Sequence, residues 1–433
     1  MKHKIILLIT VLLSGQYLHA QQTKTLTLNE AIELGLKNSN QLKSNEAKIL
    51  EATANIKEAE ERKLPDANVS GNYMYLPIHP TIDLKSGSNS NGGPSVSQVI
   101  YGSANVSLPI YNGGKIKYGI ESAKLLEQAL KLDAENDRAA VIMNITNACI
   151  NLYKAYTAIG LVKENLQTAQ QRVKDLSNLE KNGLLARNDL LKAELQSSNI
   201  ELTLLDAESN YKLSYINMNI MMGLPEQTIL IPDKSGLALP TSIKTIEEYE
   251  QDATQNRKDA AALSVRKKNA DLSLKTIKAD KYPSVAVTAG YIAADIPKFL
   301  TVYNAVNVGV GIKYNISNLW KNKSKIQQAE ARVKQVTASE SMLNDNIRMQ
   351  INEAYQNYLV SVKKIEVYEK AVDQATENYR ITKNKFDNTL ATTTELLDAD
   401  VALLQAKLRV TNAKADSFIA YNKLLQTAGD LKY

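Results

Sequence analysis

Apolar and polar residues recur along the chain with two different periods, and each change of period marks a predicted element. Stretches rich in Ala, Glu, Lys and Leu without internal Pro predict helices at about 28–62 and 246–280. Strict alternation, clearest from Val306 to Tyr314, predicts strands with one apolar and one polar face. Very long helical patterns follow at about 114–181 and 320–387. The pattern therefore predicts a mainly α-helical protein that also carries two β-hairpins, at about 66–111 and 284–316.

Each very long helix is expected to turn back on itself. Asn182-Gly183 and Asn388-Thr389 interrupt the helical pattern, which then resumes and runs to Gly223 or Gly429, where a C-terminal glycine cap is expected. In the last of these helices, apolar residues recur at coiled-coil spacing (Leu397, Val401, Leu404 and Leu408). The sequence therefore predicts two long helical hairpins, at about 114–222 and 320–428.

The chain resembles itself along its length. Residues 182–194 (NGLLARNDLLKAE) match 388–400 (NTLATTTELLDAD) at an offset of 206 residues (388 − 182), and the same offset continues without a gap from about Asn112 to Gly223. We predict a tandem repeat, with a first copy at 21–225, a linking segment at 226–245 and a second copy at 246–433. The first copy carries a longer loop, centred on about 86–94.

The N-terminus has the features of an export signal. Lys2 and Lys4 precede a short apolar run, and Ala20 is a small residue suited to cleavage before Gln21. Residues 1–20 are therefore predicted to be a signal peptide. Because no Cys follows the cleavage site, we do not expect a lipid anchor at the mature N-terminus.

The amino-acid composition argues against several classes of function, including metal binding, histidine-dependent catalysis and nucleic-acid binding. The single cysteine, Cys149, excludes an intrachain disulfide and a CxxC zinc site. Beyond the leader only His79 remains, so catalysis by a Ser/His/Asp or Cys/His arrangement is not expected, nor is a one-chain histidine metal cluster. We predict no enzyme activity, no cofactor and no metal. The net charge of +6 is too mild to indicate nucleic-acid binding.

The predicted strands need partners that one chain does not supply. Four strands with an apolar face are unstable alone in water, and the smallest closed membrane barrels have about eight strands. A homotrimer would supply twelve strands and close a barrel with its apolar side toward lipid. The 21 Tyr residues, against 3 Phe and 1 Trp, fit rings with one end in water at a membrane–water interface.

The order of these parts is similar to that of TolC-type outer membrane efflux proteins, as are the LPIYNGG segment at 108–114 and the LLDAD segment at 396–400. The resemblance covers nearly the whole mature chain. It implies a membrane β-barrel of twelve strands in a trimer, above an α-barrel of coiled-coil helical hairpins. It also implies the exit duct of an efflux or type I secretion system in a Gram-negative outer membrane. The partners would be outer membrane lipid, a periplasmic adaptor and an inner-membrane transporter of the RND, ABC or MFS type.

The resemblance also indicates which residues would line the periplasmic entrance. Glu395 and Asp398 lie three residues apart on one helix face, and Asp189 matches a third acidic position of the family. In a trimer these carboxylates would form rings that attract cations and raise one another's pKa. The alternative is that they are ordinary solvated helix acids.

The hairpin tips carry the remaining candidates. The Arg and Tyr that latch the entrance in the best-known family member are replaced here by Ala391 and Phe386, and their partner positions are Asn188 and Asp189. We therefore expect a different latch, in which Lys192 pairs with a neighbouring acid. Gly183 is expected to serve the turn. The exposed residues expected to meet the adaptor are Leu184, Leu185, Ala186, Leu390, Ala391 and Thr392.

One other class of protein fits part of the pattern. A periplasmic coiled-coil adaptor or structural protein would explain the heptads and the signal peptide. It would not explain four alternating segments placed at matching positions in two copies. An exported channel therefore accounts for more of the sequence than an adaptor does.

Overall fold

The computed structural model describes residues 23–78, 80, 96–233, 238–297 and 299–431. The predicted signal peptide, His79 and the long loop of the first copy lie outside these residues. The chain divides into two compact units. One comprises Met1–Ser44, Asp133–Asp259 and Leu343–Tyr433, and the other comprises Asn45–Leu132 and Ala260–Met342.

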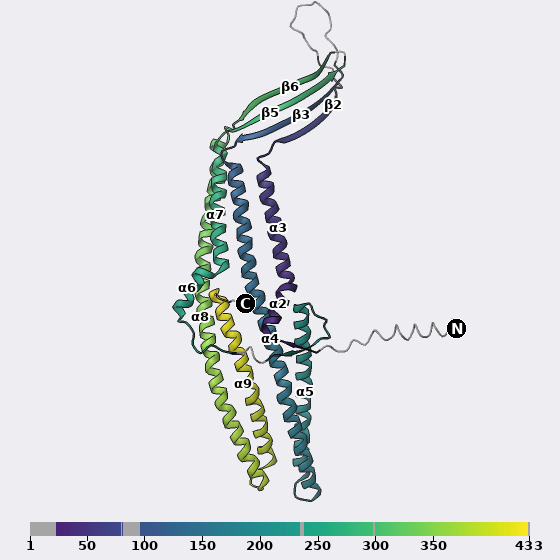
Figure 1. The fold of residues 1–433 in the computed structure, drawn as a ribbon, viewed down its shortest axis with the longest axis vertical. Coiled ribbons are helices and arrows are strands. Elements are labelled where there is room, and N and C mark those ends of the chain that lie inside the picture. Colours follow the sequence, from purple (N-terminus) through teal and green to yellow (C-terminus); the bar gives the residue numbers. More distant parts are fainter. Residues whose placement is uncertain (1–22, 79, 81–95, 234–237, 298, 432–433) are drawn as a thin grey trace, which may run out of the picture. The chain divides into compact units, whose positions relative to one another are not determined.

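Within the described residues, the element order helix, helix, strand, strand, long helix, helix occurs twice (Figure 1). The helices are α2 (Leu28–Asn38), α3 (Asn40–Glu61), α4 (Lys115–Lys181), α5 (Arg187–Met222), α6 (Ile246–Asn256), α7 (Lys258–Lys278), α8 (Asn318–Asp387) and α9 (Thr393–Ala428), with a 3-10 turn η1 at Ala279–Lys281. The strands are β1 (Thr23–Leu26), β2 (Asp66–Tyr75), β3 (Gln98–Tyr111), β4 (Ile229–Pro232), β5 (Ser284–Ile296) and β6 (Leu300–Lys313). The predicted helical hairpins are present as α4–α5 and α8–α9.

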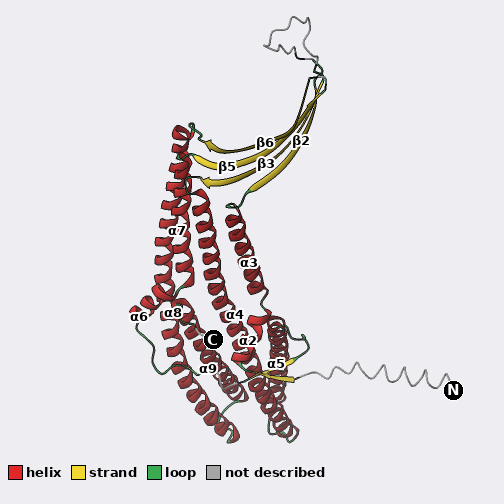
Figure 2. Cartoon of the chain, turned by 45° about the horizontal axis from the view of Figure 1, so that its top comes forward, coloured by secondary structure: helices red, strands yellow, loops and turns green. Residues whose placement is uncertain are grey.

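The two predicted β-hairpins are joined into one antiparallel sheet in the order β2-β3-β5-β6 (Figure 2). Alternation sets its two faces. One cross-strand row is Val69, Ala104, Tyr291 and Val306, and the adjacent row on the other face is Asn68, Asn105, Gly290 and Asn307. Gly290 leaves room for its neighbours, because a Cβ there would lie 2.7 Å from Asn307 Oδ1 and 2.9 Å from Asn105 Oδ1.

The prediction of one continuous helix at each of 28–62 and 246–280 was wrong. Ser39 and Arg257 adopt extended backbone conformations and separate α2 from α3 and α6 from α7. At the first break, Asn38 Nδ2 donates to Leu34 O (3.0 Å) and to Met222 O (2.6 Å) at the end of α5. The side chain competes with the helical backbone bonds and satisfies a carbonyl that α5 leaves free. No Pro occurs at either break, and the helical pattern of apolar residues continues across both, which is why the sequence predicted a single helix in each case.

The main core of the first unit surrounds the short parallel pair β1–β4, where α2, α4 and α5 meet. Its fully buried side chains include Leu26, Ile145, Leu152, Met218, Met222 and Leu230. Tyrosine contributes here as well: the ring of Tyr211 makes a T-shaped contact with Tyr215 (centroids 5.4 Å apart) and a tilted contact with Tyr156 (5.6 Å). The tyrosine excess is therefore not confined to a membrane interface, since part of it fills the junctions between helices.

In the described part of the chain, the helices are too polar to cross a membrane.

Candidate functional site

The tip of the first helical hairpin is a glycine-capped reversal. α4 ends at Lys181, and Gly183 takes the left-handed conformation (φ +74°). Its N–H donates to Glu180 O (2.9 Å), and the N–H of Leu184 donates to Leu179 O (2.9 Å). These two bonds satisfy the last carbonyls of the helix, as a left-handed cap does. Gly183 therefore serves the turn.

The second tip has the same backbone path without the glycine. Thr389 occupies the equivalent position with φ +60°, and its N–H donates to Phe386 O (2.9 Å). The N–H of Leu390 donates to Lys385 O (2.7 Å). Left-handed backbone is costly for a β-branched residue, so this turn holds strain that the first turn lacks.

The two returning helices start differently. Thr392 caps α9: Glu395 N donates to Thr392 Oγ1 (3.3 Å), and Thr392 N donates to Glu395 Oε2 (2.7 Å). Ala186, at the start of α5, has no side-chain cap. The hydrogen bonds from Thr392 hold the pKa of Glu395 below its usual range. Glu395 is therefore a capping residue in the single chain, and its pKa moves opposite to the rise expected from a ring of like charges.

The other residues predicted to line or close the entrance lie close to these tips. Lys192 Nζ is 3.1 Å from Asp189 Oδ1 on its own helix and donates to Thr394 Oγ1 (3.3 Å) on α9. Asp398 and Asn188 are exposed on their helices. Lys192 thus does pair with a neighbouring acid, and it also joins the first hairpin to the second.

The predicted docking residues do not share one environment. Leu184 and Leu390 are 73% and 76% exposed, one at each tip. Leu185 and Ala391 are half-buried, so the expectation that these two side chains are exposed was wrong. Leu185 packs on a small cluster formed by Leu176, Leu190 and Ala193, and Phe386 of α8 packs on the same cluster. Phe386 therefore makes an apolar contact between the hairpins.

A buried ion pair also joins the two hairpins. Arg172 Nη1 on α4 lies 2.8 Å from Asp400 Oδ2 on α9, and both side chains are less than 10% exposed. Asn165 Nδ2 donates to Asp400 Oδ1 (3.2 Å), and Arg172 Nη2 donates to Tyr379 Oη on α8 (3.0 Å). Burial alone would lower the pKa of Arg172, but Asp400 and Tyr379 raise it above its usual value.

Sequence reasoning missed this pair, although a signal was present. Asp400 falls on the apolar stripe of α9, in step with Leu396 and Leu397. Arg172 falls between Ala169 and Leu176 on the stripe of α4, and the two residues are equally distant in sequence from the turn residues Gly183 and Thr389. Opposite charges at matching heights on two apolar stripes predict a buried pair.

No group of three or more metal-ligating side chains occurs among the residues that the structure describes. What the tips offer is carboxylates, amides and exposed leucines on paired helices.

The arrangement of long helical hairpins and a sheet matches a known family. The sequence model for the outer membrane efflux protein matches residues 31–224 and 250–430. The chain belongs to the outer membrane efflux protein family. It is a TolC-like transport protein, as the resemblance in sequence predicted.

Curated relatives align over most of the chain. The Outer membrane protein TolC of Vibrio cholerae is 23% identical over 366 residues, which is 81% of this chain and 82% of that protein. The Outer membrane efflux protein BepC of Brucella suis is 21% identical over 438 residues, covering 97% and 89% of the two chains.

Solved structures share the fold at low identity. The outer membrane protein VceC of Vibrio cholerae superposes with a TM-score of 0.75 at 19% identity, over 94% of this chain and 97% of that one. The MtrE outer membrane channel of Neisseria gonorrhoeae, in its open state, superposes with a TM-score of 0.72 at 16% identity, over 94% and 89%. Family membership supports an outer membrane efflux channel and gives no support to an enzyme.

Proposed function

We propose that three copies of this chain form the outer membrane exit duct of an efflux or secretion system. The observation that carries the proposal is the open sheet. β2 and β6 each pair with one strand only, so each leaves an edge of backbone N–H and C=O groups free within the described sheet. Three such sheets placed edge to edge supply twelve strands and form a closed barrel that has no edges.

The exposed face of the sheet supports a lipid environment. On β6, Val306, Val308, Val310 and Ile312 are each more than 65% exposed and share one face. Alternate residues on the other face are Asn307, Gly309 and Gly311. In the closed barrel, the valine face would contact outer membrane lipid and the asparagine and glycine face would line a water-filled passage.

The helices also expose apolar side chains that a single chain does not cover. Those on α5 are Leu191, Leu195, Leu202, Leu205, Leu213 and Ile220. A comparable set lies on α8 and comprises Met349, Leu359, Val360, Val362, Val367 and Ile381. Exposed apolar side chains in this number suit contacts with other chains. Packing them against neighbouring copies would form the α-barrel in the periplasm.

The hairpin tips would form the periplasmic entrance. Asp189, Glu395 and Asp398 would form acidic rings that favour cations, and Lys192, near Asn188, would hold the hairpins together across its bond to Thr394. The exposed Leu184 and Leu390 would meet a periplasmic adaptor, with Gly183, Ala186 and Thr392 beside them. The adaptor would connect the duct to an inner-membrane transporter of the RND, ABC or MFS type. The cargo would be small molecules or polypeptides.

The proposal is tested by the mass of the native assembly and by disulfides between chains. In a Cys149→Ala background, Val69→Cys on β2 is combined in turn with Val306→Cys, Val308→Cys or Val310→Cys on β6. These positions share one face of the sheet, and the three β6 positions sample successive registers, so we expect one pair to come within disulfide reach if the copies close a barrel.

The matched control pairs Val69→Cys with Asn307→Cys, which lies on the opposite face. We expect a trimer in detergent, extracted from outer membranes, and a covalent trimer for one apolar pair only. A monomer without cross-links would contradict the duct and would favour a coiled-coil adaptor.

A further inference from the structure

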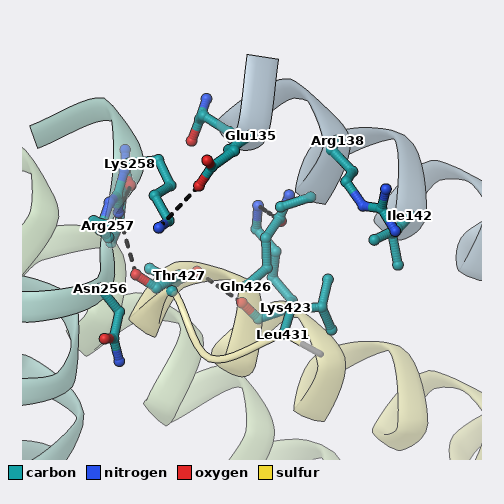
Figure 3. Close-up of a pocket in the computed structure, with 14 residues that line it drawn as sticks. Glu135, Arg138, Ile142, Asn256, Arg257, Lys258, Lys423, Gln426, Thr427 and Leu431 are labelled. Atoms are coloured by element: carbon teal, nitrogen blue, oxygen red, sulfur yellow. Dashed lines mark hydrogen bonds and ion pairs between the residues drawn. The ribbon is translucent and has the colours of Figure 1, made fainter. Parts of the chain in front are cut away.

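A pocket of about 620 Å³ lies in the first unit, where α4, the α6–α7 junction and the end of α9 meet (Figure 3). Its walls bring together four cationic side chains: Arg138, Arg257, Lys258 and Lys423. Among the described residues that line it, Glu135 is the one carboxylate. The volume falls in the range of small-molecule sites.

Two of the four cations are neutralised by carboxylates. Lys258 Nζ is 2.9 Å from Glu135 Oε2. The side chain of Arg257 is only 12% exposed. Its guanidinium forms a bidentate pair with Asp259 and also donates to Gln350 Oε1 (2.9 Å) and to Thr427 O (3.3 Å). Arg257 therefore fixes the wall of the pocket and leaves no part of its fork for a ligand.

The other two cations form no ion pair among the described residues. Lys423 Nζ donates to the neutral Gln426 Oε1 (2.9 Å), and the Arg138 guanidinium makes no hydrogen bond or ion pair in that part of the chain. Figure 3 shows both side chains at the pocket, one from α4 and one from α9. Two unneutralised charges in one concave site create a positive potential that attracts anions.

The fold does not need these charges. The equivalent break in the first half of the chain is made by Asn38 and Ser39, and the positions that match Arg257, Lys258 and Lys423 there are Ser39, Asn40 and Asn217. An uncharged junction is therefore sufficient to end one helix and begin the next. The close approach is present at both junctions, since a Cβ on Gly429 would lie 3.0 Å from Asn256 C and one on Gly223 would lie 2.8 Å from Asn38 Cγ.

We propose that this pocket binds a small oxyanion with two or more negative charges, held between Arg138 and Lys423. A guanidinium presents paired N–H donors that match phosphate and carboxylate oxygens, and an ammonium adds a second point of charge. Gln426 and Asn136 supply amide groups beside them. Phosphate and carboxylate compounds share this chemistry. The site lies within one chain and does not depend on the trimer or on conduction.

The proposal is tested by calorimetric titration of the full-length protein in detergent with sodium pyrophosphate and, separately, with sodium citrate. Both titrations run at constant ionic strength, with chloride as the reference, because salt screens exposed charges. We expect saturable binding of at least one of the two oxyanions. Binding of pyrophosphate alone would assign a phosphate compound, and binding of citrate alone a carboxylate.

The decisive variant is Arg138→Gln with Lys423→Gln, which should weaken binding by roughly tenfold or more. The matched control is Arg409→Gln with Lys174→Gln, which removes the same two charges from exposed positions on α9 and α4. Circular dichroism checks that both variants remain folded. No saturable binding of either oxyanion, or equal binding by the decisive and control variants, would overturn the proposal.

Discussion

Arg172 on α4 and Asp400 on α9 form an ion pair, with 2.8 Å between Nη1 and Oδ2, that ties the first helical hairpin to the second. Both side chains are almost fully buried, and Tyr379 and Asn165 satisfy further hydrogen bonds. Removing one partner would leave the other charge buried without compensation.

We expect Arg172→Met or Asp400→Leu alone to lower the free energy of unfolding by about 3–5 kcal/mol. The double variant should lose much less, because a well-packed apolar pair leaves no unpaired charge. Urea unfolding of the three variants, followed by circular dichroism in detergent, forms a double-mutant cycle. Additive losses would show that the two charges do not act as a pair.

The strained turn at Thr389 gives a second prediction. Thr389→Gly should raise the free energy of unfolding by about 1 kcal/mol, because glycine accepts a left-handed backbone without the Cβ penalty. Gly183→Thr, at the equivalent position of the first hairpin, should lower it by a similar amount. The midpoints of urea unfolding measure both changes. A destabilised Thr389→Gly protein would mean that the Thr389 side chain contributes more than its backbone costs.

The capping box of α9 should make its first turn sensitive to acid. The pKa of Glu395 lies below its ordinary value of 4.5, so the stabilisation is complete above about pH 4.5 and is lost as the pH falls through the lowered value. Hydrogen-exchange protection at Glu395 and Leu396 should fall across that window. Thr392→Ala should lower protection at neutral pH and remove most of the pH dependence. Protection that is constant from pH 6 to pH 3 would contradict the prediction.

At the start of α5 a capping side chain can be added instead of removed. Ala186 occupies the N-cap position without a capping side chain. Ala186→Ser should therefore stabilise the protein by about 1 kcal/mol in urea unfolding. Ala186→Val is the control, since valine offers no acceptor.

The sequence predicted the helices and strands of this fold better than it predicted how they pair and pack. Alternation from Val306 to Tyr314 and the unbroken helical pattern at 114–181 depend on local periodicity, which the sequence contains directly. The breaks at Ser39 and Arg257 involve long-range contacts, from Asn38 to Met222 O and from Arg257 to Gln350 and Thr427 O, and the spacing of apolar residues does not mark them. The pairing of β3 with β5 likewise joins segments from the two halves of the chain.

The candidate site shows the same division. Lys192 was expected to pair with a neighbouring acid because Ala391 and Phe386 stand where a latch of Arg and Tyr was sought, and it does contact Asp189. The capping role of Glu395 was readable from the Thr392–Glu395 spacing but was overlooked. Predicting the Arg172–Asp400 pair requires knowing which residues of α4 and α9 lie at the same level along the paired helices. That alignment depends on the positions of the turns at Gly183 and Thr389.

Cys149 offers a probe of the first unit's core. Burial raises the pKa of its thiol to about 11, and it packs among Ile145, Leu152 and Met218. A thiol reagent at pH 8 should label the native protein very slowly and the urea-unfolded protein at once, because the thiolate is the reactive form. Ser198→Cys, placed in a Cys149→Ala background at an exposed position on α5, is the control and should react quickly in both states. Rapid labelling of native Cys149 would show that this core opens readily.

Lys192 should contribute to keeping the proposed entrance closed. Its side chain is 48% exposed and its ammonium donates to Thr394 on the other hairpin, so the contact in each copy stabilises the closed entrance only weakly. We expect Lys192→Ala to raise basal ion leakage through the protein in planar bilayers by roughly twofold to fivefold. Thr394→Val should raise it by a similar factor, and the double variant should add nothing further if the two residues act through one contact. Lys174→Ala, which removes a charge from an exposed position on α4, should leave leakage unchanged. Equal leakage in the Lys192→Ala and Lys174→Ala proteins would show that Lys192 plays no part in closing the entrance.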